Sequence, residues 1–380
     1  MDFSLFYFAN HDGGALEADK YALMLDSARW ADRNGFARLW VPERHFHSFG
    51  GLSPNPSVLA AAFATTTERI GICSGSVVLP LHDPIRVAEE WAVVDNLSRG
   101  RVGLGLACGW VPNDFVISDL QAQFGSRKRI FEEKIALLRK LWRGEPQRVT
   151  NPQGEEITIQ TVPRPLQQDV PLWITAAANP ETFRQAGAMG ANLLTHLLGQ
   201  TLKGLAEKIA VYRQAWSEAG HSGSGTMTLM LHTLVGDDDE EVHTLAREPM
   251  KRYLAGSLNL ASAHLASVPF IKNASEIDLD ALTNEQVDQT LEASFEKYFH
   301  MGSLMGSYEK CLDTIDELEG IGVDEVACLI DFGVKEEIVR ASLERLNVVR
   351  VLSNPTRLDD SAPAPQPLDR ARDDEHAQPH

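Results

Sequence analysis

The feature that most constrains the fold is a repeated alternation between short β-rich runs and amphipathic helical stretches. In the helical stretches apolar residues recur at spacings of three and four, as in Leu202, Leu205 and Ile209. Because parallel strands need long crossover connections, which helices usually supply, the alternation predicts an α/β protein with a parallel sheet. The predicted strands are Phe3–Phe8, Ala37–Val41, Ile70–Leu79, Val102–Ala107, Leu172–Ala176, Ala191–Thr195, Met227–Val235 and Glu325–Ile330.

Two architectures fit this alternation, a (β/α)8 TIM barrel and an open doubly wound sheet. The eight predicted strands and the length of 380 residues favour the barrel. A doubly wound dinucleotide-binding domain should carry G-x-G-x-x-G after an early strand, and no such motif follows the first or the second strand. Gly103-Leu104-Gly105 lies inside the fourth predicted strand, where tight packing within a barrel explains the glycines better.

Three segments depart from a minimal barrel. Residues 145–165 predict a hairpin that turns at residues 151–154 and is inserted before the fifth strand. Residues 255–306 form a long insertion before the last helix, with a composition that suits a mobile lid over the barrel mouth. Residues 353–380 are rich in Pro, Asp and Arg and almost without apolar residues, so we expect a disordered tail after a barrel domain of residues 1–352.

Composition argues against several classes of function. Lys and Arg total 35 against 53 Asp and Glu, and the resulting net charge of −18 disfavours nucleic acid and anionic membrane surfaces as partners. No apolar run is long enough for a membrane span, and the first ten residues lack the basic segment of a secretory signal. The four cysteines form no C-x-x-C pair, which argues against a disulfide scaffold and a zinc ribbon. We therefore expect a cytoplasmic enzyme.

In a barrel, active-site groups project from the carboxyl ends of the strands, and the end of the fifth strand is the most informative. Asn179 suits a helix N-cap and is followed by a proline, so a helix should begin there. Its free N–H groups would favour an anion such as phosphate; small Ala177 and Ala178 would permit close approach, and Thr182 would add a hydroxyl. A plain capped helix explains the same residues, and Glu181 must point away if an anion binds.

Ionisable residues cluster after the second predicted strand. A histidine can donate or accept a proton near neutral pH, so His45 is a candidate acid–base group, with Glu43 or Arg44 to orient or tune it. A structural loop histidine fits the sequence equally well. Cys108, at the end of the fourth strand, has no base beside it in sequence, so a packed thiol explains it better than a nucleophile does.

The triplet His45-Phe46-His47 supports a rival hypothesis, a metal-dependent barrel hydrolase with Asp331 as a further ligand. Such centres place the triplet after the first strand, whereas here it follows the second. The three alanines at residues 176–178 also offer no Lys or His at the end of the fifth strand. We therefore expect no metal.

A series of motifs resembles the bacterial luciferase-like flavin monooxygenases over roughly residues 1–350. Two segments, Pro42–His47 and His196–Gln200, together with residues 327–333, are similar to the branch associated with modular peptide and polyketide assembly lines. The motifs of the wider family are Trp40–Phe46, Val77–Glu90, Asp95–Arg101, Gly109–Trp110, Asn113–Phe115, Asn179–Thr182, Gly190–His196 and Gly322–Val326.

The resemblance implies that the strand ends bind FMN, with its phosphate at the start of the helix after the fifth strand. Ala177, Ala178, Asn179 and Thr182 would contact the cofactor there. The flavin would arrive as reduced FMN from a separate flavin reductase, because no nicotinamide-binding domain is evident in the sequence. Dioxygen would then oxygenate the substrate.

The resemblance also implies contacts with the flavin ring. The bond between Gly75 and Ser76 matches an unusual non-prolyl cis peptide bond beneath the ring in that family. Cys108, Thr195 and His196 match positions beside the ring or the substrate. These five residues complete the predicted cofactor-binding set.

Glu43, Arg44 and His45 are the predicted catalytic residues, with His45 as the acid–base group. True luciferases have two adjacent histidines after the glutamate, whereas here Arg44 takes the first place. Cys108 likewise stands where luciferase has an arginine. We therefore do not expect light emission from a long-chain aldehyde. The permanent charge of Arg44 instead suits an anionic substrate or a peroxide.

The implied substrate is a natural-product intermediate, either a small molecule or a carrier-protein-bound thioester. The implied assembly is a homodimer formed through the helices after the second and third strands, where the small-residue stretch Leu59–Ala64 permits close approach. Two further alternatives keep the barrel, a deazaflavin-dependent hydride-transfer oxidoreductase and a non-catalytic flavin-storage protein.

Overall fold

The barrel predicted from the alternating pattern is present in the computed structural model, which describes residues 1–8, 19–118, 121–262 and 283–354. Parallel strands pair in the closed order β1-β2-β3-β4-β7-β8-β9-β11, and β11 pairs again with β1. The barrel strands are β1 (Asp2–Phe6), β2 (Arg38–Val41), β3 (Gly71–Val78), β4 (Val102–Ala107), β7 (Leu172–Thr175), β8 (Asn192–His196), β9 (Met227–Val235) and β11 (Glu325–Leu329). Each of them overlaps a predicted strand, so the TIM-barrel prediction is confirmed and the open sheet is excluded.

The barrel interior shows why this sequence closes. Glu325 is fully buried there and accepts hydrogen bonds from Trp40 Nε1 at 3.0 Å and Arg38 Nη1 at 2.7 Å. The two glycines of β4 serve packing, as expected. A Cβ atom on Gly103 would lie 2.8 Å from the Trp173 ring, and one on Gly105 would lie 2.2 Å from a backbone oxygen of β3. Large aromatic rings therefore fill the space that the glycines leave free.

Helices surround the barrel, and several begin at a capping side chain followed by a proline. Pro56 and Pro84 occupy the first positions of α2 and α3, after the capping side chains of Asn55 and Asp83. The helices are α1 (Ala22–Arg33), α2 (Pro56–Thr66), α3 (Pro84–Ser98), α4 (Arg127–Arg143), α5 (Pro180–Ala188), α6 (Leu202–Glu218), α7 (Asp239–Ser262), α8 (Asn284–Met301), α9 (Tyr308–Gly320) and α10 (Glu336–Leu352), with short 3-10 helices η1 (Leu79–Leu81), η2 (Pro112–Ser118) and η3 (Gln121–Ser126). Within the described part of the chain, no helix is both long and apolar enough to cross a membrane.

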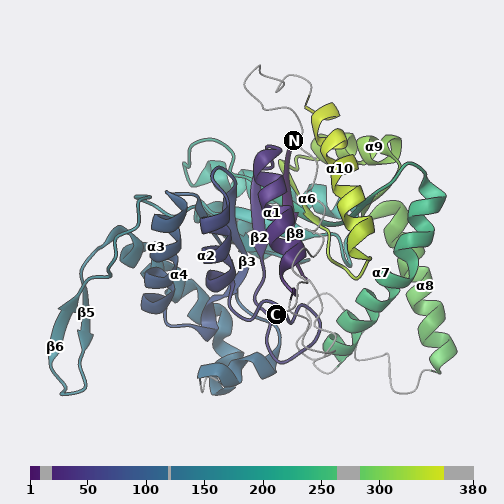
Figure 1. Ribbon diagram of the computed structural model, residues 1–380. Coiled ribbons are helices and arrows are strands. Elements are labelled where there is room, and N and C mark those ends of the chain that lie inside the picture. Colours follow the sequence, from purple (N-terminus) through teal and green to yellow (C-terminus); the bar gives the residue numbers. More distant parts are fainter. Residues whose placement is uncertain (9–18, 119–120, 263–282, 355–380) are drawn as a thin grey trace, which may run out of the picture.

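The predicted hairpin is present as β5 (Gln147–Thr150) and β6 (Glu156–Ile159), which pair antiparallel and project from the body of the molecule (Figure 1). The side-chain oxygen of Asn151 accepts the backbone N–H groups of Gln153 and Glu155 and so closes the turn. Because these hydrogen bonds join residues within a few positions of each other, the hairpin could be predicted from the sequence.

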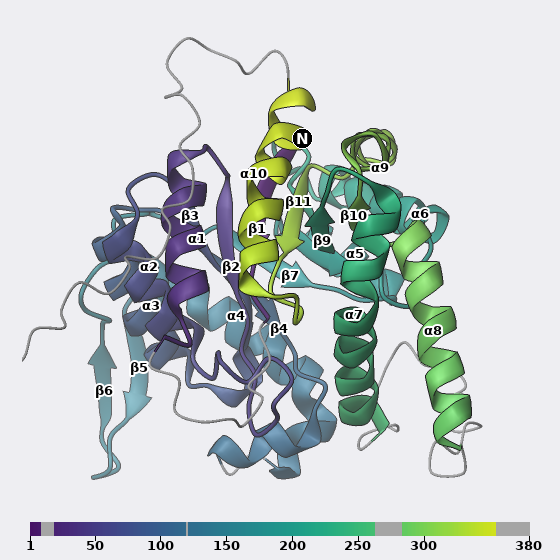
Figure 2. The same cartoon turned by 45° about the vertical axis from the view of Figure 1, so that its right-hand side comes forward.

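The predicted insertion at 255–306 is partly described. It contains the end of α7, the helix α8 and a short strand β10 (Leu304–Gly306) that pairs with β9 and was not predicted. Helices α7 and α8 run side by side (Figure 2). Residues 263–282 of the insertion lie outside the described residues, as do residues 355–380 of the predicted tail. The lid and the disordered tail therefore stay predictions.

Candidate active site

The predicted site residues all lie at one end of the barrel, because the carboxyl ends of parallel strands share an edge. Glu43, Arg44 and His45 follow β2, and Ser76 lies in the last part of β3. Cys108 follows β4, Asn179 precedes α5 after β7, and His196 ends β8. Most of them belong to three groups, which lie around Glu43, between β3 and β7, and at the end of β8.

Glu43 is the centre of the first group and is buried. Its Oε1 lies 2.7 Å from His45 Nε2 and 2.7 Å from His82 Nε2, while its Oε2 accepts the backbone N–H of Val78 at 2.8 Å. Burial would raise the pKa of Glu43, but the hydrogen bonds from the two histidines outweigh it and the pKa is lowered. Glu43 is therefore a charged carboxylate that joins β2 to β3.

This carboxylate determines the tautomer of His45. An ionised carboxylate only accepts hydrogen bonds, so Nε2 of His45 must donate and Nδ1 is left as the acceptor of the neutral ring. Burial would lower the pKa of His82, but its hydrogen bond to Glu43 and the charge of that group outweigh it, and the pKa is raised. His82 lies in the Leu81–Pro84 segment after β3, and sequence reasoning did not assign it to the site.

Arg44 makes no hydrogen bond to Glu43 or His45 among the described residues; of the two side chains expected to orient or tune His45, Glu43 is the one that contacts it. The Nη1 atom of Arg44 faces Asp114 Oδ2 at 3.5 Å, and its guanidinium carbon lies 5.2 Å from the centre of the Trp110 ring. Burial raises the pKa of Asp114 to about 6, and the charge of Arg44 only partly offsets this effect. Trp110 and Asp114 follow β4 and belong to family motifs, but they were given no role, because nothing in the sequence places them beside Arg44 in the loop after β2.

The second group lies between β3 and β7. The bond between Gly75 and Ser76 is cis, as the family resemblance implied. A Cβ atom on Gly75 would lie 2.8 Å from the Phe6 ring, so the barrel interior leaves no room for a side chain. The hydroxyl groups of Ser76 and Thr175 are hydrogen-bonded to each other across the strands.

The start of α5 is built as expected. Asn179 caps the helix by accepting the backbone N–H of Glu181 at 3.1 Å, and Ala177, Ala178 and Thr182 around it are all partly accessible. Glu181 forms an exposed ion pair with Arg184. Its charge is therefore held away from the helix start, which was the condition for an anion to bind there.

The third group lies at the end of β8. Thr195 is buried, and burial lowers the pKa of His196 to about 4, so this imidazole is neutral. The side-chain nitrogen of Gln200 donates to the carbonyl oxygen of His196 at 2.6 Å and to Thr195 Oγ1 at 3.3 Å. The Oε1 atom of Gln200 is buried and has no hydrogen-bond partner among the described residues. A buried acceptor without a partner suits a ring N–H donor such as a flavin carries, so the residues here fit that cofactor. Gln200 was not predicted as a site residue. Its position four residues after His196 is the sequence signal that could have identified it.

An aromatic cluster lies beside these groups, and sequence reasoning missed it. His232 of β9 is buried, its Nδ1 lies 3.0 Å from the Tyr298 hydroxyl, and its ring contacts Tyr253 of α7. Burial lowers the pKa of His232 to about 3. Tyr253 also packs on Phe49, which packs on Phe8 after β1. Helix α7, at a position just before the predicted insertion, therefore packs onto the loops after β1 and β2.

The structure does not support the two rival roles considered for these residues, that of metal ligands and, for Cys108, that of a nucleophile. His45 binds Glu43, His47 accepts the backbone N–H of Phe49, and Asp331 accepts that of Phe8. In the part of the chain that the structure describes, no three His, Cys, Asp or Glu side chains are grouped to hold a metal. Burial raises the pKa of Cys108, which agrees with a packed thiol rather than a nucleophile.

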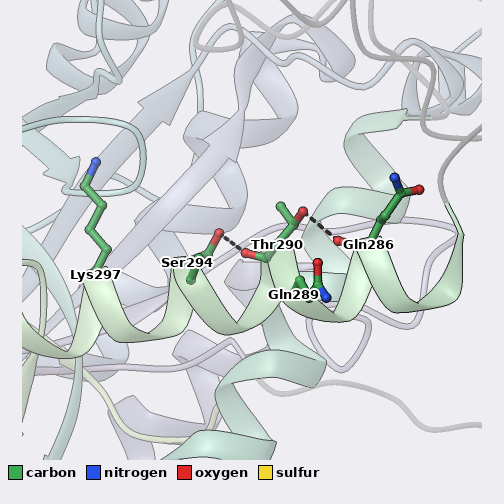
Figure 3. A pocket seen from close by; sticks show the side chains of 6 residues that line it. Gln286, Gln289, Thr290, Ser294 and Lys297 are labelled. Atoms are coloured by element: carbon green, nitrogen blue, oxygen red, sulfur yellow. Dashed lines mark hydrogen bonds between the residues drawn. The ribbon is translucent and has the colours of Figure 1, made fainter.

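A separate hollow runs along the exposed face of α8 (Figure 3). The hydroxyl of Thr290 donates to the carbonyl oxygen of Gln286, and that of Ser294 to the carbonyl oxygen of Thr290. These polar groups serve the helix itself. The barrel mouth, where buried ionisable groups from several strands meet, is therefore the candidate active site.

Comparison with known proteins identifies the family of the chain. The oxygenase component of the flavin-dependent trigonelline monooxygenase of Acinetobacter baylyi is 26% identical over 354 residues, which cover 91% of this chain and 93% of that protein. The oxygenating constituent of 3,6-diketocamphane monooxygenase from Pseudomonas putida, solved with FMN, has a TM-score of 0.68 at 18% identity, covering 86% of this chain and 91% of that one. An F420-dependent secondary alcohol dehydrogenase has a TM-score of 0.61 at 18% identity, covering 90% and 99%. The sequence-family model of the luciferase-like monooxygenases matches residues 1–325 of this chain. The chain therefore belongs to the luciferase-like monooxygenase family.

Proposed function

We propose that the protein is the oxygenase component of a two-component system that uses reduced FMN and dioxygen to oxygenate a natural-product intermediate. The observation that carries the proposal is the pairing of His45 with the buried carboxylate of Glu43 at the mouth of a barrel of this family. A separate flavin reductase supplies the reduced cofactor. The intermediate is either a free small molecule or a thioester on a carrier protein.

The start of α5 and the ends of β3 and β8 would hold the cofactor. The positive end of the α5 dipole and the Thr182 hydroxyl suit the phosphate, while the N–H groups of Glu181 and Thr182 are already bonded to Asn179. The unpartnered Oε1 of Gln200 and the neighbouring Thr195 and His196 suit the ring. Cys108 borders this region as a neutral thiol. When bound, the reduced flavin supplies the two electrons that activate dioxygen.

His45 is the acid–base group in this proposal. Glu43 fixes Nε2 as a donor, so the proton exchanged with the reacting molecule is held or released at Nδ1. The ring is only 12% exposed, which restricts exchange of this proton with bulk water. Phe8, Phe49 and Tyr253 exclude water from the adjoining end of the barrel.

The test measures oxygen uptake and flavin binding with purified full-length protein. Anaerobic fluorescence titration should show tight binding of reduced FMN. When oxygen is then added, the reduced FMN should be oxidised and oxygen should be taken up. The alternative function is hydride transfer with a deazaflavin, which the likeness to an F420-dependent dehydrogenase favours. Tighter binding of reduced deazaflavin than of reduced FMN, with no oxygen consumed, would replace the oxygenase proposal with this alternative.

We also propose that the protein is a homodimer that pairs through α2 and α3. These helices expose Val58, Val93 and Leu97, apolar side chains that a second copy would cover. Light scattering at micromolar concentration should give twice the chain mass of 41.9 kDa. A monomer at that concentration would refute the proposed assembly.

A further inference from the structure

Arg44 presents a buried positive charge whose hydrogen bonds are incomplete. Its side chain is 7% exposed, and the nearest carboxylate, Asp114, is 3.5 Å away. Charge-assisted hydrogen bonds of arginine are about 2.7–2.9 Å long, so this pair is loose. Among the described residues the guanidinium has no hydrogen bond, and both Arg44 Nε and Asp114 Oδ1 are buried without a partner. A buried guanidinium is costly unless its donors are satisfied.

The surroundings of Arg44 leave the edge of the guanidinium for a ligand. The Trp110 ring covers one region of the cation, 5.2 Å from the guanidinium carbon, and Asp114 meets a single nitrogen atom. Arg44 lies next to His45 in the loop after β2 and faces the helix η2 after β4, at the barrel mouth. An acceptor that enters there would lie close to the proposed acid–base group.

We propose that Arg44 binds a carboxylate of the substrate, so that the molecule oxygenated is a carboxylic acid held by this group beside the reacting centre. The inference rests on the proposed function and names its substrate class. The planar fork of an arginine matches a carboxylate through two parallel hydrogen bonds, which a lysine cannot provide. Asp114 is a positioning residue that holds the guanidinium while the carboxylate is absent.

The charges around Arg44 favour a monoanion over a phosphate. The titratable groups that face Arg44 and Asp114 are Glu43, His45 and Tyr253. Glu43 is occupied by the histidines, and burial raises the pKa of Tyr253 and keeps its phenol neutral. Arg44 and Asp114 together carry no net charge, so a carboxylate adds one buried negative charge where a phosphate dianion adds two. The smaller desolvation cost favours the carboxylate.

A proton on Asp114 would remove even this single excess charge. A second carboxylate nearby raises the pKa of an acid, and burial already holds that of Asp114 at about 6. Binding of a carboxylate above this pH therefore takes up a proton at Asp114. The affinity should increase as the pH falls from about 8 towards 6, and should level off below that value.

The test uses benzoate as the probe and benzamide as its uncharged analogue, measured by calorimetry on the full chain without flavin. Benzoate should bind to the wild type more tightly than benzamide by about tenfold or more. Arg44→Gln should remove this preference and Arg44→Lys should retain part of it, while the exposed Arg129→Gln is a matched control that should leave it unchanged. Circular dichroism and thermal unfolding confirm that each variant is folded.

Asp114→Asn tests the proton linkage separately. It should bind benzoate at least as tightly as the wild type, and without the pH dependence between about pH 6 and 8. Equal affinity for benzoate and benzamide, no benzoate binding by the folded wild type, or full benzoate binding by Arg44→Gln would each overturn the inference. Because the assay needs neither flavin nor oxygen, benzoate binding without flavin-dependent oxygen uptake would refute the proposed function and leave the anion site standing.

Discussion

Replacing Glu43 by glutamine tests the hydrogen-bonded group of Glu43, His45 and His82 most directly. The carboxylate accepts from both histidines and from the backbone N–H of Val78. Both rings bond to Oε1, whereas Val78 bonds to Oε2. A glutamine can accept through one oxygen only, so if it keeps the bond from Val78 its amide nitrogen turns donors towards both rings. Both histidines must therefore change their tautomer or move.

The magnitude follows from the kind of hydrogen bond lost. A hydrogen bond to a charged group contributes about 1.5–3 kcal/mol and a neutral one about 1 kcal/mol. Converting the two histidine bonds should therefore lower the free energy of unfolding by about 1–4 kcal/mol, since the bond to Val78 can survive. Glu133→Gln removes an exposed ion pair and should change it by less than about 0.5 kcal/mol.

The pH dependence of this loss has a definite sign. The folded pKa of His82 is raised, so its contribution is fully present below the unfolded value near 6.5 and is lost as the pH rises through the folded value. The pKa of Glu43 is lowered, so its contribution is present above 4.5 and is lost as the pH falls through the folded value. The difference between wild type and Glu43→Gln should therefore be largest between about pH 5 and 6.5.

Urea unfolding at several pH values measures the stability difference, and nitrogen-detected NMR of the histidine rings reports their tautomers and pKa values. In the wild type His45 should show a protonated Nε2, and the pKa of His82 should fall in Glu43→Gln. An unchanged pKa of His82, or a stability difference that does not vary with pH, would refute the role given to this carboxylate.

Three further substitutions test the rest of the site. His45→Ala should lower the rate of substrate oxygenation by about 10²–10⁴-fold while leaving reduced FMN affinity within a few-fold; an unchanged rate would exclude His45 as the acid–base group. Gly75→Ala brings a methyl group to within 2.8 Å of a buried ring and should cost about 1–3 kcal/mol in urea unfolding, whereas Gly320→Ala, with no described atom within 4 Å, should not. Asn179→Ala and Asn55→Ala should each lose about 0.5–2 kcal/mol of stability as caps, but only Asn179→Ala should weaken FMN in a fluorescence titration; equal FMN affinity would contradict a phosphate site at α5.

The parts of the fold that depend on local patterns were predictable. Strand and helix periodicity, the turn around Asn151 and the caps at Asn55 and Asn179 are set by residues within a few positions of each other, and all are present in the structure. The short strand β10 was missed because three residues carry no usable period. It exists because β9 extends far enough to pair with it.

The site was predictable to a similar extent. Glu43 and His45 are two residues apart, so a contact between them was foreseeable, and the family motifs pointed to the ends of β3, β7 and β8. His82 and Asp114 were not assigned, because the chain brings them to Glu43 and Arg44 from 39 and 70 residues away.

By itself, then, the sequence determined a barrel of alternating strands and helices, the family it belongs to, and the end of the barrel at which the candidate site lies. These properties follow from hydrophobic period, capping chemistry and the order of motifs along the chain. The tertiary structure alone decided which partner each charged side chain has. Glu43 faces His82 and Arg44 faces Asp114 because closing the barrel brings strand ends together irrespective of their separation in sequence, and burial there sets which of these groups carries a charge.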